Sequence, residues 1–146
     1  MKMTRKEFLA ARDAINRACM DTGMSYATRN ELIEALETQW YSGFDVGDRG
    51  GVRYYTDIEP VTVVRKTACS VTVRFDSAKL DPSWHPEMIP GGFSAVCVND
   101  DEQKWIIEEN PDGPTETFRW SKKNSRYMNH GKVLIPGWTK YYDYNF

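Results

Sequence analysis

Two patterns of apolar residues divide this chain into a helical first part and a strand-rich second part. Apolar residues recur at helical spacing over Phe8–Cys19 and again over Leu32–Trp40. That spacing places them on one face of a helix. Over Val61–Phe75, apolar and polar residues alternate instead, which is typical of strands with one buried face. We therefore expect two amphipathic helices followed by antiparallel β-structure.

The ends of both helices are marked by capping residues. Thr4–Glu7 and Thr28–Glu31 each fit a capping box, in which a threonine hydroxyl and a glutamate satisfy helix N–H groups. Gly23 suits a left-handed cap after the first helix, and Ser42–Gly43 ends the second. Because the connection is short, we expect an antiparallel helical hairpin over residues 1–43, with its apolar stripes covering the sheet.

The β-structure is organised around a predicted hairpin at Pro60–Phe75. The long, proline-rich segment Asp76–Gly92 has no periodicity and is predicted to be one loop, whose length suggests a function. Short turns separate the remaining strands, which favours antiparallel pairing. These strands are predicted at Val52–Tyr55, Phe93–Val98, Lys104–Glu109, Glu116–Ser121, Arg126–Met128 and Lys132–Ile135.

The order of these elements predicts the fold class. Helices first and strands after favour α+β over an alternating parallel architecture. We expect a single domain over residues 1–146, with the helical hairpin (1–43) packed on a bent, largely antiparallel sheet or small barrel (44–146). The aromatic end of the chain, Trp138–Phe146, is expected to pack against the sheet.

Composition changes this picture little. The net charge is −2, so bulk electrostatics point to no particular partner. No apolar run is long enough to cross a bilayer, and the N-terminus lacks the apolar region of a signal peptide. Cys19, Cys69 and Cys97 are odd in number and far apart, which is typical of free thiols in a reducing compartment. We expect a cytoplasmic protein.

No motif with a known catalytic mechanism is present. Cysteine and histidine ligands exist, but none has the close pairing of a zinc site, so no metal or cofactor is predicted. The glycines of Gly47–Gly51 lack the lysine and the strand–loop–helix context of a nucleotide-binding loop. We expect a protein that is not an enzyme.

A basic and aromatic interval, Thr115–Lys140, is the strongest binding signal. Cations supply phosphate affinity and rings supply stacking platforms, as in proteins that bind single-stranded nucleic acid. A sheet with one wet face accounts for the same residues and is the favoured interpretation. The candidate binding residues, with two from the predicted loop, are Arg119, Trp120, Lys122, Lys123, Arg126, Tyr127, Lys132, Trp84 and His85.

Three segments together resemble small bacteriophage accessory proteins, some of the counter-defence type: Val46–Asp48, Pro60–Phe75 and Asp112–Phe146. The resemblance covers the chain from Val46 onward. It implies a phage or mobile-element origin and action by binding a host factor, including defence systems. The first strands also look like a small barrel of the Src-homology or Tudor kind, which is an analogy at fold level.

Three functions follow as hypotheses. The first is a non-enzymatic phage protein that blocks a host protein or protein–nucleic-acid complex in the host cytoplasm, such as a CRISPR (anti-CRISPR activity) or other defence effector. The second is a nucleic-acid-binding module that uses the basic and aromatic strands. The third is a sponge for a small signalling nucleotide. The sequence does not decide between a monomer and a homodimer, since edge strands and aromatic patches look the same in both.

Overall fold

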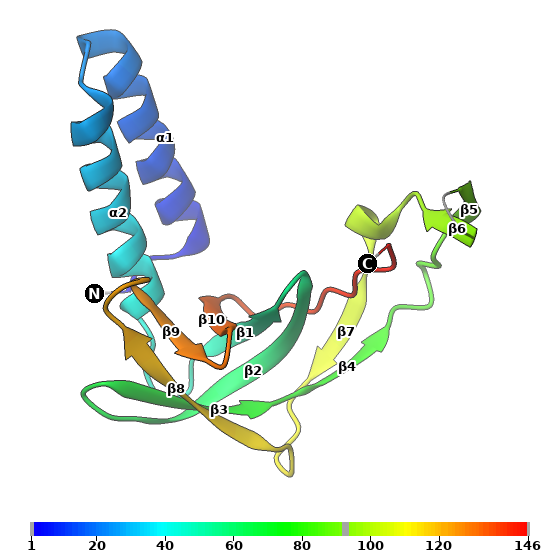
Figure 1. Ribbon diagram of the computed structural model, residues 1–146. Coiled ribbons are helices and arrows are strands. Elements are labelled where there is room, and N and C mark those ends of the chain that lie inside the picture. The colour runs from blue at the N-terminus through cyan, green and yellow to red at the C-terminus, as the bar shows by residue number, and fades with distance from the viewer. Residues whose placement is uncertain (1, 92–93, 146) are drawn as a thin grey trace.

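The computed structural model describes residues 2–91 and 94–145 and contains a helical arm, a closed barrel and a β-rich lobe (Figure 1). The helical arm comprises α1 (Arg5–Thr22) and α2 (Tyr26–Ser42). The barrel comprises β1 (Arg49–Tyr54), β2 (Asp57–Lys66), β3 (Ser70–Phe75), β8 (Thr115–Ser121), β9 (Arg126–Asn129) and β10 (Lys132–Pro136). The lobe comprises β4 (Ser77–Leu80), β5 (Met88–Gly91), β6 (Ser94–Cys97), the 3-10 turn η1 (Asp100–Glu102) and β7 (Trp105–Glu108).

The barrel closes in the strand order β1-β10-β9-β8-β3-β2, and every neighbouring pair is antiparallel. The predicted hairpin at Pro60–Phe75 is confirmed as the paired strands β2 and β3. The α+β class is confirmed as well, with an N-terminal helical hairpin packed on a small antiparallel barrel. The alternation of short strands and tight turns therefore predicted the antiparallel strands of the barrel.

The core fills the barrel interior with the inward-facing residues of the strands. Val61, Val63, Val71 and Val73 are at most 1 % exposed. Val64 faces outward, as strand alternation requires, and the pairing with β3 shifts its register between Val63 and Arg65. Each fully buried side chain of this size contributes about 1.5–3 kcal/mol relative to its exposed state. The remaining members of the core cluster are Phe44, Val52, Phe118, Tyr127 and Leu134.

The helical arm stands out from the barrel instead of lying on it (Figure 1). α1 packs along α2, and only the base of the arm contacts β9 and β10. The one buried side chain of the described helices is Phe8, whose ring stacks on Trp40 at a centroid distance of 4.2 Å. The prediction that the apolar stripes cover the sheet is therefore wrong, because the two stripes face each other.

The helix ends test the capping predictions. Thr4 Oγ1 accepts a hydrogen bond from the Glu7 backbone N–H at 3.1 Å, and Gly23 adopts φ of 69°. The threonine cap and the left-handed glycine of α1 are therefore confirmed. The predicted start of α2 at Thr28 is wrong. Ser25 Oγ accepts from the Thr28 backbone N–H, and the helix begins at Tyr26 because this serine already satisfies the orphan donor.

The segment predicted as one loop contains two strands. β4 pairs with β7 and β5 pairs with β6, so the loop prediction is wrong over half of Asp76–Gly91. Leu80 lies opposite Trp105, far along the chain, and such a partner leaves no local pattern. Gly92 of the predicted loop and Phe93 of the following predicted strand lie outside the described residues. Residues 81–87 do form a connection between strands, as expected.

The C-terminal segment links the barrel to the lobe. Tyr141 exchanges two backbone hydrogen bonds with Ile58 of β2, at 2.9 and 3.0 Å. Farther along, the Asn145 side chain bonds both the N–H and the C=O of Cys97 in β6. The expectation that this aromatic end packs against the sheet is confirmed for its described residues. Neither described helix is long and apolar enough to cross a membrane.

Candidate binding groove between the arm and the barrel

Most of the residues predicted to form a basic and aromatic surface have structural partners. Tyr127 is buried in the core and Trp120 packs against it. Lys132 Nζ donates to both carboxylate oxygens of Glu116, at 2.6 and 2.7 Å. These side chains stabilise the barrel, so the rings offer no stacking platform on its outer face.

Arg126 joins the barrel to the helical arm. Its guanidinium pairs with Glu37 of α2, with 3.3 Å between Nη2 and Oε2. The same group lies over the Tyr41 ring, 3.5 Å from the centroid. The cation therefore braces the base of the arm from the side of β9, a contact between residues that are 89 positions apart.

Three predicted cations remain exposed. Arg119, Lys122 and Lys123 lie on β8 and the turn after it, and none has an ion-pair partner among the described residues. Arg65 lies on the same side, because β2, β3 and β8 are consecutive neighbours in the sheet. These four side chains form a basic surface, and the predicted rings Trp120 and Tyr127 do not lie on it.

Trp84 and His85 lie far from that surface, in the lobe. Trp84 is buried, with its ring 5.7 Å from that of Tyr144. His85 is exposed, and its backbone carbonyl accepts from the Asn99 amide at 2.9 Å. The predicted binding residues are therefore not brought together into one site.

A groove of about 620 Å³ lies where the helical arm meets β10 and the C-terminal segment. Its lining combines rings from three different elements, namely Phe8, Trp40 and Trp138. Three arginines also line it: Arg5 and Arg12 from α1, and Arg53 from β1. Grooves of this size with apolar walls and a few polar groups are the usual form of binding sites. We call this feature the junction groove.

The charges of the junction groove are not balanced. Arg5 and Arg53 have exposed side chains and no ion-pair partner among the described residues, and Arg12 contacts only the Phe8 ring, at 5.7 Å. Lys140, by contrast, is paired with Glu59, and the groove acid Glu37 is held by Arg126. Only Asp101 opposes the three arginines, so the groove attracts anionic groups.

One hydrogen-bond donor beside this groove has no acceptor. The indole Nε1 of Trp40 is buried and makes no hydrogen bond with the described residues. Buried polar groups normally have a partner. Because this nitrogen has no accessible surface, it is not a contact point for a bound molecule, and Trp40 lines the groove and a neighbouring cavity of about 240 Å³ through the rest of its ring.

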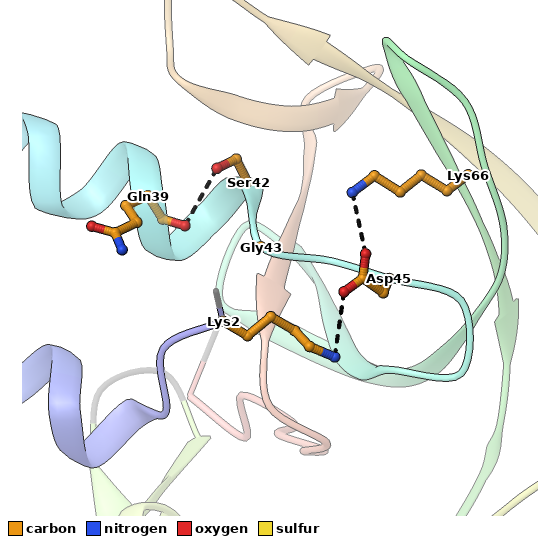
Figure 2. Close-up of a pocket in the computed structure, with 6 residues that line it drawn as sticks. All are labelled: Lys2, Gln39, Ser42, Gly43, Asp45 and Lys66. Carbon is orange, nitrogen blue, oxygen red and sulfur yellow. Dashed lines mark hydrogen bonds and ion pairs between the residues drawn. The ribbon is translucent and has the colours of Figure 1, made fainter.

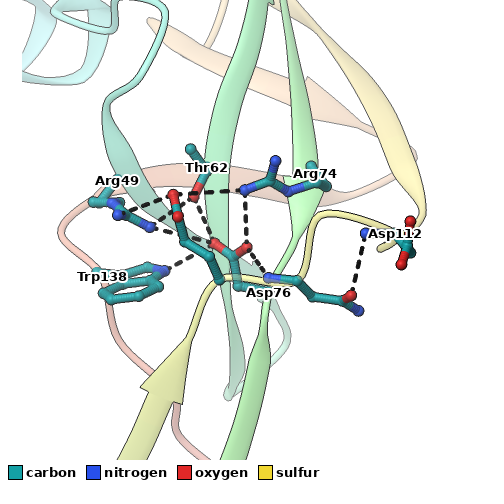
Figure 3. Close-up of polar contacts among 8 residues, drawn as sticks. Arg49, Thr62, Arg74, Asp76, Asp112 and Trp138 are labelled. Carbon is teal, nitrogen blue, oxygen red and sulfur yellow. Dashed lines mark hydrogen bonds and ion pairs between the residues drawn. The ribbon is translucent and has the colours of Figure 1, made fainter.

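A buried carboxylate fixes one wall of the groove (Figure 3). The Asp76 side chain is 0 % exposed. It accepts hydrogen bonds from Thr62 Oγ1 at 2.6 Å, from Trp138 Nε1 at 3.1 Å and from the Asn110 backbone N–H at 3.1 Å. The Trp138 ring, which lines the groove, is thereby held in place by its nitrogen.

Two arginines complete this network. Arg49, Thr62 and Arg74 are cross-strand neighbours in one row over β1, β2 and β3. Arg74 Nη2 lies 3.4 Å from Asp76, and Arg49 lies 4.0 Å from it while stacking over the Trp138 ring at 4.1 Å. Both guanidiniums also approach Glu109. The two cations thus offset the cost of burying a carboxylate.

The chain reaches this wall through a special backbone conformation. Gly137 has φ of 101°, in the region that side chains with a Cβ rarely adopt. It follows β10 and precedes Trp138, so the glycine allows the strand to turn and deliver the ring. Farther along, burial and a hydrogen bond to Asp100 raise the pKa of Tyr141, which keeps this groove residue neutral.

A second cavity, of about 480 Å³, lies at the end of α2 (Figure 2). Its cations are already engaged: Lys2 and Lys66 both lie 3.6 Å from Asp45, and Lys66 also donates to the Phe44 carbonyl. The Asp48 carboxylate hydrogen-bonded to Lys2 raises the pKa of that amine. Because its charges are paired internally, this cavity is a weaker candidate than the junction groove.

Comparisons with models of protein families, with curated proteins and with solved structures find no match to this chain. Within the described residues, no cluster of histidine, cysteine and acidic side chains could hold a metal ion. The candidate site therefore rests on geometry. Sequence reasoning missed it because Arg5, Arg53 and Trp138 belong to segments that share no local pattern.

Proposed function

We propose that this protein is a non-enzymatic binding protein and that the junction groove is its working surface. One observation carries the proposal: the groove combines the half-buried rings of Trp40 and Trp138 with three arginines that have no ion-pair partner among the described residues. An open concave surface that combines rings and arginines fits the hot spots of protein interfaces, which are rich in tryptophan, tyrosine and arginine. A segment of a partner protein is the occupant that we propose.

The biological setting that we propose is the host cell of a bacteriophage. The support is the sequence resemblance to small phage accessory proteins. On this proposal the partner is a host component, such as a CRISPR or other defence effector, and binding blocks it in the host cytoplasm. The projecting helical arm adds a second surface on which such a partner can rest.

A plating assay in defended bacteria tests this proposal. The protein is expressed in strains that each carry one defence system, and phage survival is compared for the wild type, for the double variant Arg5→Glu/Arg53→Glu and for a matched control, Arg119→Glu/Lys122→Glu. We expect protection in at least one strain, loss of protection with the groove variant, and no loss with the control. Protection that survives the groove variant would contradict the proposal.

A small signalling nucleotide is a second candidate ligand of the same groove. The observation that favours it is the pairing of guanidiniums with rings, seen for Arg12 over Phe8 and for Arg49 over Trp138. Rings can stack a base and arginines can hold phosphate. A thermal-shift screen against cyclic nucleotides tests it, since a ligand at about 100 times its Kd stabilises the folded state by about 2.7 kcal/mol. No shift with any nucleotide removes this candidate.

Nucleic acid is a third candidate, supported by the exposed and unpaired Arg119, Lys122 and Lys123. With the predicted rings Trp120 and Tyr127 inside, these cations supply attraction to phosphate only. We expect any binding to single-stranded DNA to be weak and strongly salt-dependent. Replacing the three cations by alanine checks this, and an unchanged affinity counts against the candidate.

A further inference from the structure

We infer that the occupant of the junction groove is an acidic, extended segment of a partner protein, with an apolar or aromatic side chain between its carboxylates. This inference rests on the proposed function and adds the chemistry of the partner. It is carried by the charge of the groove and by the spacing of two arginines.

The spacing of Arg5 and Arg12 determines the spacing that we expect between the carboxylates of the bound segment. Both residues line the groove, and they are two turns apart on one face of α1. Seven residues of α-helix rise by about 10 Å. A polyproline-type chain advances about 9 Å in three residues, after which side chains point the same way again. Acidic residues three positions apart therefore match the two arginines.

The opposite side of the groove provides a third cation and the apolar contact. Arg53 comes from the end of β1 and is not tied to any acid among the described residues. The rings of Trp40 and Trp138 lie between the arginines of α1 and the barrel. An apolar side chain of the segment can bury itself against these rings while its neighbours meet the arginines.

A nucleic acid fits the same groove less well. Duplex DNA carries one negative charge about every 1.7 Å of its axis, so that any acidic residue on its path is costly. Asp101 lines the groove, and the whole chain has a net charge of −2. A peptide with a few spaced carboxylates meets the arginines and avoids Asp101.

A peptide-display selection tests the inference. A random library of short peptides is selected on the immobilised full-length protein, with counter-selection on the Arg5→Glu/Arg53→Glu variant. We expect the enriched peptides to carry Asp or Glu about three positions apart around an apolar or aromatic residue. A fluorescein-labelled synthetic copy of the leading peptide is then titrated against the wild type, the groove variant and the control Arg119→Glu.

The titrations have clear outcomes. We expect the affinity to fall about tenfold or more, about 1.4 kcal/mol or more, with the groove variant, to fall with added salt, and to stay unchanged with Arg119→Glu. Enrichment of neutral or basic peptides, binding that the groove variant retains, or tighter groove-dependent binding of a single-stranded oligonucleotide would each overturn the inference.

The titrations can be compared only if the groove variant and the Arg119→Glu control are both folded. The Arg5 and Arg53 side chains are exposed, so their charge reversal is expected to leave the melting temperature unchanged. If it does not, the alanine variants of the same residues take its place. Selection of acidic peptides without groove-dependent protection in cells would count against the proposed function alone, and protection without acidic selection would count against this inference alone.

Discussion

At the scale of single residues, Asp76 is the most constrained side chain of the structure. Its carboxylate accepts hydrogen bonds from a strand hydroxyl, an indole and a backbone amide, and two arginines lie beside it. It therefore ties together β2, the segment before β8 and the residues after β10. Arg126 plays a comparable part at the base of the arm, through Glu37 and Tyr41.

Replacing Asp76 tests how much this network contributes. In Asp76→Asn, an amide NH₂ faces donors and the two arginines keep only Glu109 as a carboxylate partner, so we expect a loss of about 3–5 kcal/mol in the free energy of unfolding. Asp112→Asn is the matched control, because that side chain is exposed and is expected to change stability by less than about 0.5 kcal/mol. Urea denaturation of both variants checks the difference. Equal midpoints would contradict it.

Tyr127 is expected to make the stability of the fold depend on pH in the alkaline range. Burial raises the pKa of this phenol above its usual value of about 10, so the folded state holds the proton more tightly than the unfolded state. Its contribution to stability is full below the ordinary pKa and is lost as pH rises through the folded-state pKa. We expect Tyr127→Phe to lessen the decline of stability above about pH 10, and the exposed Tyr26→Phe to leave it unchanged. Urea denaturation across alkaline pH measures both.

At the scale of elements, the described helices of the arm contain one buried side chain, Phe8. Its stack on Trp40 lies near the base of the arm, whereas the distal half carries exposed apolar side chains such as Met20 (86 %) and Tyr26 (78 %). A helical hairpin of this kind gains most of its stability from packing rather than from propensity. The arm is therefore firm at its base and the least stabilised element at its tip.

Truncating the stack is expected to loosen the arm and not the barrel. Phe8→Ala should cost about 3–5 kcal/mol of packing, within the range for large core side chains. The backbone amides of α1 and α2 should then exchange hydrogen faster, with no change in β2 and β3. Leu32→Ala, at a half-exposed position of the same arm, is the control. Uniform loss of protection across the whole chain would show that arm and barrel unfold together.

The same scale shows what the sequence could and could not predict. The strands of the barrel were predictable because alternation in Val61–Phe75 is a local consequence of one buried face. β4 was not, because its partner β7 is remote in the sequence, and β5 was not, because three of its four residues are exposed and leave no alternation. Arg126 and Lys132 were correctly located in basic strands. Their role depends on ion pairs with Glu37 and Glu116, which only the tertiary structure brings to them. The junction groove was unpredictable for the same reason.

At the scale of the whole molecule, the arm and the lobe are attached to opposite sides of one closed barrel (Figure 1). The barrel core draws on a single residue of the connection, Phe44, and on none from the arm. The barrel should therefore be able to fold without the helices, although it loses the brace of Arg126 on α2.

A shortened chain that begins at Phe44 tests this organisation. We expect it to keep the β-sheet signal and a cooperative thermal transition, with a melting temperature lower by about 5–10 °C for a loss of about 1–2 kcal/mol. It should also lose all groove-dependent binding, since Arg5, Arg12 and Trp40 are gone. Circular dichroism and the peptide titration measure the two effects. A shortened chain with no cooperative transition would show that the arm is part of the folding unit.

The pairing of β1 with β10 has a consequence for synthesis on the ribosome. The arm contains its own contacts and can form as soon as residues up to Ser42 have emerged. The barrel cannot close before Pro136 has left the exit tunnel, because its first strand pairs with its last. During that interval the outer edge of β1 is open to other nascent chains. A slow ribosome near the end of the message would lengthen this exposure, so the yield of soluble protein should depend on how fast the last strands are translated.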